Sequence, residues 1–131
     1  MGRSEQSVVY LDTHIVVWLY AGLTEKLTEN AKEKIDNCDV LISQMVRLEL
    51  QYLFEIGRIK TTPAILIKSL SRSIDLRLSD CLLKEIIDES LKIDWTRDVF
   101  DRLLAAEAAA KGAGFITADA DIRTNLKQAI W

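Results

Sequence analysis

The sequence has few of the features that mark secreted, disulfide-linked or linker-rich proteins. It contains one proline, five glycines and two cysteines. The cysteines, Cys38 and Cys81, stand alone without a CxxC pair or metal-ligand spacing, which argues against a disulfide framework and fits reduced thiols in the cytoplasm. So little proline and glycine leaves no room for a long disordered linker.

Long hydrophobic runs are also absent. No stretch reaches the ~18 uninterrupted apolar residues that a membrane span needs. Residues 8–20 come nearest, and Asp12 and His14 interrupt them. The first residues, MGRSEQS, lack the apolar core and the cleavage site of a signal peptide. We therefore expect a cytoplasmic protein that does not contact a membrane.

The rest of the composition is that of an ordinary globular protein. The 131 residues are 49% hydrophobic and 28% charged, enough for one domain that buries roughly two thirds of its unfolded surface. We expect a single domain over residues 1–131. Seventeen basic and 20 acidic residues give a net charge of −3. This charge argues against a generally basic surface that coats nucleic acid, but not against contact with a phosphate through bound metal ions.

Charge is unevenly spread along the chain. Residues 56–74 contain no acidic residue but carry four basic ones: Arg58, Lys60, Lys68 and Arg72. We call residues 56–74 the basic hairpin. It is either a solvated helical surface or a basic rim beside an acidic site that contacts RNA.

Apolar runs of strand length alternate with helical patterns, which is typical of an α/β protein with a parallel sheet. Strands are expected at residues 7–11, 39–43, 74–79 and 114–119. Helices are expected at residues 13–20, 28–38, 43–57, 64–71, 81–93, 98–112 and 120–130. Thr28 is the expected N-cap of its helix, Ser79 or Asp80 that of helix 81–93, and Gly57 and Gly112 end two others.

Two aspartates follow predicted strands. Asp12 comes directly after the first strand, and Asp119 ends the GFITAD run. In open parallel sheets ligands bind beyond the carboxyl ends of the strands. Aspartate is also a preferred N-cap where a strand turns into a helix. Either residue alone is therefore explained equally well by a cap or by a site.

Glu49 is harder to explain structurally. On its helix it interrupts an apolar stripe made by Met45, Val46, Tyr52 and Leu53. A carboxylate left there without a partner would cost several kcal/mol or give up its charge. Its partner is either a core arginine, which Arg47 on another face cannot supply, or a cation shared with other acids.

Asp98 and Asp101 begin the helix at residues 98–112. Their spacing is that of an N-cap and an acid at the third helical position, which explains one carboxylate. Arg102 is explained if it holds a neighbouring acid in place.

Together, Asp12, Glu49, Asp101 and Asp119 form a coherent candidate site. Clustered carboxylates repel one another, and a hard divalent cation such as Mg²⁺ or Mn²⁺ compensates them. Such a cation lowers the pKa of a bound water and neutralises a phosphodiester in the transition state. His14, the only histidine, cannot form a zinc site alone and is taken as structural. Thr117 and Ser43, at strand ends, are candidates for positioning water or phosphate.

The order of VVYLDTHIVVWLY, ISQMVRLELQYL, RDVFDRLLAAEAAAKG and FITAD resembles the PIN-domain family, and within it the VapC-like toxin ribonucleases of toxin–antitoxin pairs. The resemblance covers nearly the whole chain, from LDTHIVVWLY to the terminal AIW. It implies a compact three-layer α/β/α PIN-like fold with a central, mostly parallel sheet. Val99 stands where the family commonly has a proline, which affects only the helix entry.

The family's acidic positions fall on Asp12, Glu49, Asp101 and Asp119. The resemblance gives all four the roles of metal ligands and catalytic residues. It implies a Mg²⁺- or Mn²⁺-dependent endoribonuclease that hydrolyses RNA, is covered by a small antitoxin and forms a homodimer.

Other protein classes fit the sequence less well. A phosphatase of the haloacid dehalogenase type needs a second aspartate where this chain has His14. A receiver domain needs a paired acid and a late lysine, neither of which is evident. DNA-directed nucleases of related fold are usually larger. The main alternative is a non-catalytic PIN-like module that binds protein or RNA, although the presence of all four acids argues against it.

Overall fold

The computed structural model describes residues 7–131. Five strands form one sheet in the order β3-β2-β1-β4-β5, and every pairing is parallel. The strands are β1 (Val8–Leu11), β2 (Asp39–Ile42), β3 (Arg77–Leu78), β4 (Gly114–Ile116) and β5 (Ala129–Ile130). The MGRSEQS segment, on which the absence of a signal peptide was judged, lies almost wholly outside the described residues.

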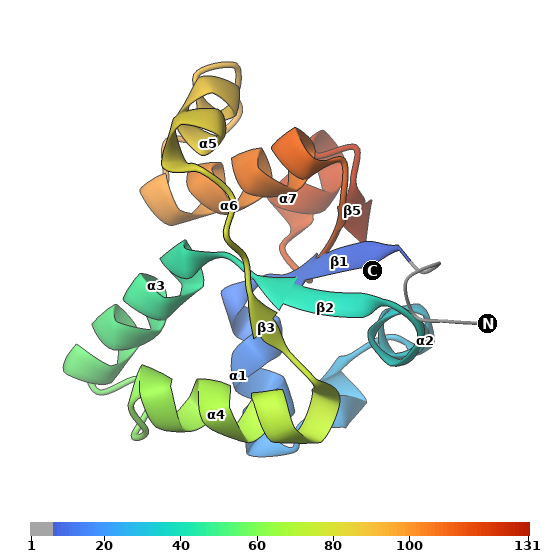
Figure 1. Cartoon of the computed structure of the whole chain (residues 1–131), viewed down its shortest axis with the longest axis vertical. Helices are drawn as coiled ribbons and strands as arrows, with labels where there is room; N and C mark the ends of the chain where they lie inside the picture. The colour runs from blue at the N-terminus through green and yellow to red at the C-terminus, as the bar shows by residue number, and fades with distance from the viewer. Residues whose placement is uncertain (1–6) are drawn as a thin grey trace.

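Helices cover both faces of the sheet. They are α1 (Thr13–Ala21), α2 (Glu29–Asn37), α3 (Gln44–Glu55), α4 (Pro63–Ile74), α5 (Leu83–Ser90), α6 (Val99–Lys111) and α7 (Ala120–Asn125), with a short 3₁₀ turn, η2 (Thr24–Lys26). Helices α1, α3 and α4 lie on one side of the sheet, and α5, α6 and α7 lie on the other (Figure 1). The expected three-layer α/β/α architecture is confirmed. Within residues 7–131 no helix has the length and apolar content to cross a membrane.

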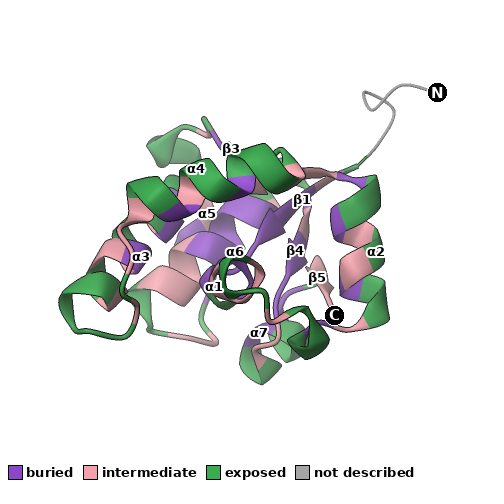
Figure 2. Ribbon diagram, turned by 90° about the horizontal axis from the view of Figure 1, so that it is seen from below, coloured by how far each residue is buried: buried purple, intermediate pink, exposed green. Residues whose placement is uncertain are grey.

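The central strand is buried on both faces. Val9, Tyr10 and Leu11 are at most 2% exposed, which explains why β1 reads as a continuous apolar run rather than an alternating one. Figure 2 shows the buried residues gathered in the strands and on the inner sides of the helices. On α6, Ala105, Ala106 and Ala108 are fully buried, so small side chains let this helix pack closely on the sheet.

Most of the expected helix ends are confirmed. The Thr28 hydroxyl accepts a hydrogen bond from Ala31 N, as an N-cap does. Gly112 ends α6 in the left-handed conformation, with φ of 61°. Pro63 is the first residue of α4, where its missing N–H leaves no helical hydrogen bond unmade.

The expected cap of α5 was wrong. This helix begins at Leu83, and its N-cap, Leu82, forms no side-chain cap bond. The Ser79 hydroxyl instead shares a hydrogen bond of 2.8 Å with the Tyr10 hydroxyl and accepts one from Cys81 N. Ser79 therefore forms a buried hydrogen bond with β1 and does not cap α5.

The last helix was predicted too long. It ends at Asn125, and Ala129–Ile130 form a strand that the sequence did not suggest. This strand covers the free edge of β4, because Phe115 N donates to Gln128 O and Thr117 N donates to Ile130 O. Pairing of these backbone groups replaces about one and a half further turns of helix.

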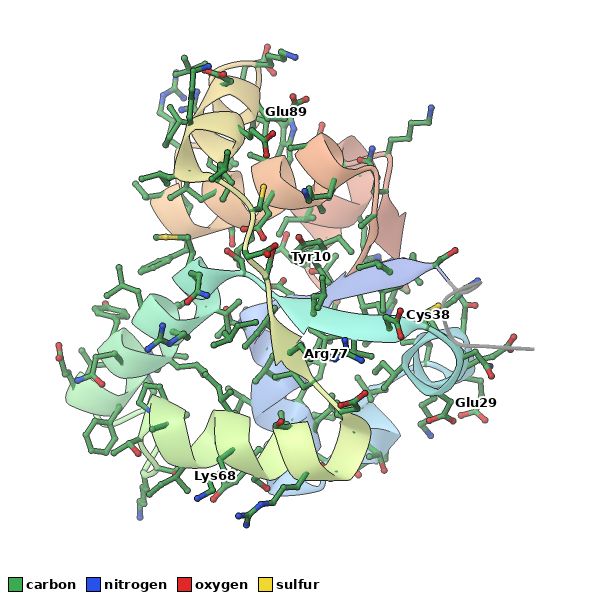
Figure 3. The ribbon with its side chains drawn as sticks, in the orientation of Figure 1. Tyr10, Glu29, Cys38, Lys68, Arg77 and Glu89 are labelled. Carbon is green, nitrogen blue, oxygen red and sulfur yellow. The ribbon has the colours of Figure 1, made fainter. Side chains whose placement is uncertain are left out.

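The basic hairpin comprises the connection from α3 to α4 and the whole of α4. Its four basic side chains are exposed, and Lys68 projects from α4 away from the sheet (Figure 3). Within residues 7–131 none of the four forms an ion pair. They are thus open to a ligand, and contact with RNA stays a prediction.

Candidate active site

The candidate site lies where the chain connections diverge. Strand β1 continues into α1 on one side of the sheet, whereas its neighbour β4 continues into α7 on the other side (Figure 1). Leu11 pairs with Ile116, and Asp12 N donates to Ile116 O at 3.0 Å. Asp12 and Asp119 therefore leave adjacent strands at the same edge. Open α/β sheets bind their ligands at such a switch point.

Asp12 is 2% exposed, and both of its carboxylate oxygens are held. One accepts a hydrogen bond of 2.8 Å from Thr13 N and caps α1. The other accepts a bond of 2.6 Å from the Thr117 hydroxyl and lies 4.0 Å from His14 Nδ1. Asp12 is thus a helix cap whose second oxygen faces the end of β4, and its role in a ligand site stays a prediction.

Glu49 lies on α3 near the buried residue Val46, but Tyr52 of the expected apolar stripe is 51% exposed, so only part of that stripe faces the core. Its Oε1 accepts a hydrogen bond of 2.6 Å from the hydroxyl of Thr13, which is 1% exposed. Within residues 7–131 no basic side chain forms an ion pair with it. The alternative of a core arginine is wrong, since the partner is a hydroxyl from the start of α1.

The first turn of α6 carries two acids. Asp98 caps the helix by accepting a hydrogen bond of 2.9 Å from Asp101 N, as the spacing predicted. The expectation for Arg102 was wrong: its Nε donates to Ser90 O at 2.9 Å and joins α6 to the end of α5. No arginine holds Asp101 in place, so within the described chain its charge is not neutralised by an ion pair.

Thr117 connects the remaining acid to Asp12. Its hydroxyl donates to Asp12 and accepts a hydrogen bond of 3.0 Å from Asp119 N. Asp119 caps α7 by accepting from Ile122 N at 2.9 Å. Thr117 is fully buried, so it positions the ends of β1 and β4 relative to each other. Ser43, the other candidate, caps α3 by accepting a bond from Met45 N.

The carboxylates influence one another. Burial raises the pKa of Asp12, against the effect of the Thr117 hydrogen bond. Burial also raises the pKa of Glu49, and the nearby Asp12 carboxylate raises it further, while the Thr13 bond lowers it. The fold therefore holds both groups in an environment that opposes their ionisation.

The other candidate acids all affect the pKa of Asp101. Its pKa is raised from 3.8 to about 7. Burial is the largest cause, and the charges of Asp98, Asp12, Asp119 and Glu49 act in the same direction. The other three acids that the sequence singled out therefore lie near enough for their charges to act on Asp101. We call Asp12, Glu49, Asp101 and Asp119 the carboxylate cluster, and exposed Asp98 stands beside it.

The sequence profile of the PIN domain matches residues 9–125 of this chain. The chain belongs to the PIN-domain family. No curated protein matches the sequence.

Solved structures share the PIN fold. The chain is similar to a crystal structure of VapBC2 from Rickettsia felis bound to a DNA fragment from their promoter, with a TM-score of 0.66 and 21% identity over 94% of this chain and 96% of the other. It is also similar to a domain of a functionally unknown protein from Methanocaldococcus jannaschii DSM 2661, with a TM-score of 0.56 and 17% identity over 95% and 90% of the two chains. At these identities the likeness concerns the fold.

The donors of this PIN domain suit a hydrated cation. Within residues 7–131 no three His, Cys, Asp or Glu side chains are arranged to hold a metal ion directly. Mg²⁺ usually keeps several of its waters and binds through one or two carboxylates together with substrate phosphates, rather than in an all-protein cage. An all-oxygen cluster in which the pKa values of Asp12, Glu49 and Asp101 are raised fits Mg²⁺ or Mn²⁺ bound partly through water.

Sequence reasoning missed two contributors to the site. Thr13 holds Glu49, and Asp98 adds to the charge around Asp101. Thr13 adjoins Asp12 in the motif LDTH, and a hydroxyl beside the first acid was the available signal. Asp98 was assigned only its cap, although three-residue spacing places it on the same helix face as Asp101.

Proposed function

We propose that this PIN domain is a Mg²⁺- or Mn²⁺-dependent endoribonuclease that acts as the toxin of a toxin–antitoxin pair. The carboxylate cluster carries the proposal: four acids converge at the switch point, and burial raises the pKa of three of them. Such crowding lowers stability unless a cation compensates it. Family membership supports a nuclease over a structural role for the cluster.

Each acid has a defined part in the proposal. Asp12 and Glu49 would hold the cation directly or through water, because Thr117 and Thr13 fix their orientation. Asp101 and Asp119 would complete the set from α6 and α7. Bound there, Mg²⁺ or Mn²⁺ would supply a hydroxide nucleophile at neutral pH and neutralise charge on the phosphodiester.

The proposal extends to partners. The structural relative from Rickettsia felis is a VapBC2 complex, which supports a cognate antitoxin that covers the site of this protein. We also propose that the protein forms a homodimer and acts in the cytoplasm, where isolated cysteines stay reduced. A short open reading frame for an antitoxin immediately upstream of the gene is the expected genomic sign.

Cleavage assays test the proposal. Purified protein should cut single-stranded or looped RNA with Mg²⁺ or Mn²⁺ and lose this activity in EDTA. Asp119→Asn, which keeps an oxygen for the cap of α7, is the matched inactive control. Undiminished cleavage in EDTA would refute the metal mechanism. No cleavage across pools of tRNA, rRNA and mRNA would favour the non-catalytic PIN-like binding module.

A further inference from the structure

A row of aromatic rings lies along α1 and leads away from the carboxylate cluster. The ring centroids of His14 and Trp18 are 6.3 Å apart, and those of Trp18 and Trp131 are 6.4 Å apart. His14 and Trp18 are four residues apart on one helix and therefore share a face. Trp131 reaches this face from the end of β5. We call these three residues the aromatic row.

The row begins at the cluster itself. His14 Nδ1 lies 4.0 Å from an oxygen of Asp12, yet the His14 side chain is 64% exposed. Its ring thus lies beside the buried carboxylate of Asp12 and is open to solvent. A base beside a phosphodiester held at the cluster would meet this ring first.

A cation accompanies the second ring. Lys26 Nζ lies 5.3 Å from the centre of the Trp18 ring, within the range of a cation–π contact. Trp18 and Trp131 are partly buried against the core, so packing explains part of their presence. Packing does not explain His14, which is exposed, or the ammonium group held over Trp18.

Aromatic rings combined with cations are the usual means of holding single-stranded nucleic acid. Bases stack on the rings, whatever their sequence, and the cations contact the phosphates. Double-stranded RNA cannot use such rings, because its bases are already stacked on each other. An aromatic row that binds RNA would therefore discriminate between unpaired and paired bases.

We propose that the aromatic row is the substrate subsite next to the carboxylate cluster. The unpaired base beside the cleaved bond stacks on His14, and the following nucleotide lies against Trp18 with its phosphate near Lys26. Trp131 packs against Trp18 and fixes its ring. This inference rests on the proposed ribonuclease function and adds the residues that select RNA with unpaired bases.

Steady-state cleavage of one RNA, presented single-stranded and as a duplex, tests the subsite. Loss of one stacked base is worth about 5- to 150-fold in affinity. His14→Ala should therefore raise KM for the single strand by about this factor and reduce the preference for it over the duplex. His14→Phe keeps a ring and should restore most of the loss. Trp18→Leu, which keeps an apolar side chain in the packed position, should act in the same direction as His14→Ala.

Tyr20→Ala is the matched control, because Tyr20 is an exposed aromatic residue of α1 outside the aromatic row. If the parent cleaves RNA and His14→Ala leaves KM and strand preference unchanged, the subsite is wrong and the proposed function stands. If His14→Phe is as impaired as His14→Ala, the imidazole acts through Asp12 and the stacking inference fails. A loss of equal size in Tyr20→Ala would also refute it. A parent that cleaves no RNA refutes the function, and the subsite with it.

Discussion

Replacing Asp101 by asparagine should stabilise the metal-free protein at alkaline pH. Burial and the neighbouring acids raise the pKa of Asp101 from 3.8 to about 7. Well below 3.8 the carboxyl is protonated in both the folded and the unfolded chain and does not affect stability. As pH rises from there towards 7, the unfolded chain ionises first, so the folded state loses stability. Above 7 this loss is complete.

The size of the effect follows from the two pKa values. A difference of about three units is worth about 4 kcal/mol. Asp101 is partly exposed, and solvent screening reduces the expected change to about 2 kcal/mol. Asparagine keeps the shape, and Asp101 N, which donates to Asp98, is unaltered. Within residues 7–131 the Asp101 carboxylate accepts no hydrogen bond that the amide would lose.

Urea melts in EDTA at about pH 5 and about pH 8.5 measure this change, because the two conditions lie on either side of the upper pKa. The advantage of Asp101→Asn at about pH 5 should be less than half of that at about pH 8.5, because pH 5 already lies above the unfolded pKa of 3.8. Asp121→Asn is the matched control, since Asp121 is an exposed acid in the first turn of α7. It should be destabilised by about 0.3–1 kcal/mol through loss of its interaction with the helix dipole.

Two results would refute the reasoning. If Asp101→Asn is less stable than the parent at the higher pH in EDTA, a favourable contact holds the carboxylate and outweighs the effects of burial and of the neighbouring acids. If saturating Mg²⁺ fails to stabilise the parent more than the variant, the folded protein does not bind the cation through Asp101, because binding to the folded state alone stabilises it by mass action.

Three further changes test other parts of the site. Glu49→Gln keeps an oxygen for the Thr13 hydroxyl and removes a charge, so urea melts in EDTA should show it as stable as the parent or more so, by ~1 kcal/mol, with cleavage reduced by orders of magnitude. Destabilisation by several kcal/mol with cleavage retained would make Glu49 half of a structural pair. Thr117→Val removes the donor to Asp12, so calorimetric titration should show weaker Mn²⁺ binding that Thr117→Ser restores; equal affinity in all three proteins would leave Thr117 a purely structural role. Alanine at all four basic positions of the basic hairpin should flatten the salt dependence of RNA binding, measured by fluorescence anisotropy, by about 0.7 in slope for each phosphate that the variant no longer neutralises. An unchanged slope would make the basic hairpin a solvated surface or a partner interface.

The long elements could be predicted because their side chains follow the burial that defines them. Strand β1 reads as a continuous apolar run because both of its faces are covered. Helix α3 reads as amphipathic because one of its faces packs against α6, α4 and α1. Strand β5 could not be predicted in this way. It has two residues, Ala129 and Ile130, and exists because β4 offers a free edge, which is a property of the folded molecule.

Contacts between buried polar side chains were the other feature that the sequence did not predict. Ser79 was assigned to a helix cap, yet its hydroxyl pairs with that of Tyr10, 69 residues away. Glu107 was not singled out in its alanine-rich helix, yet it is 1% exposed and interacts with the side chain of Tyr10, whose pKa it helps to raise. Local sequence spacing carries no information on such contacts, because the partners come from other elements.

Taken one at a time, an acid of the site could be either a helix cap or a ligand, and there is a physical reason for this ambiguity. A carboxylate has two oxygens and several acceptor positions, so capping a helix uses only part of it. Asp12 caps α1 with one oxygen and turns the other towards Thr117. Asp119 caps α7 with one oxygen, and the other accepts no hydrogen bond within residues 7–131. The cap fixes the direction of the side chain and thereby helps to orient the remaining oxygen for a cation. A residue type favoured at a strand-to-helix turn is therefore also the type that such a site requires, and only the joint pattern of four acids separates the two roles.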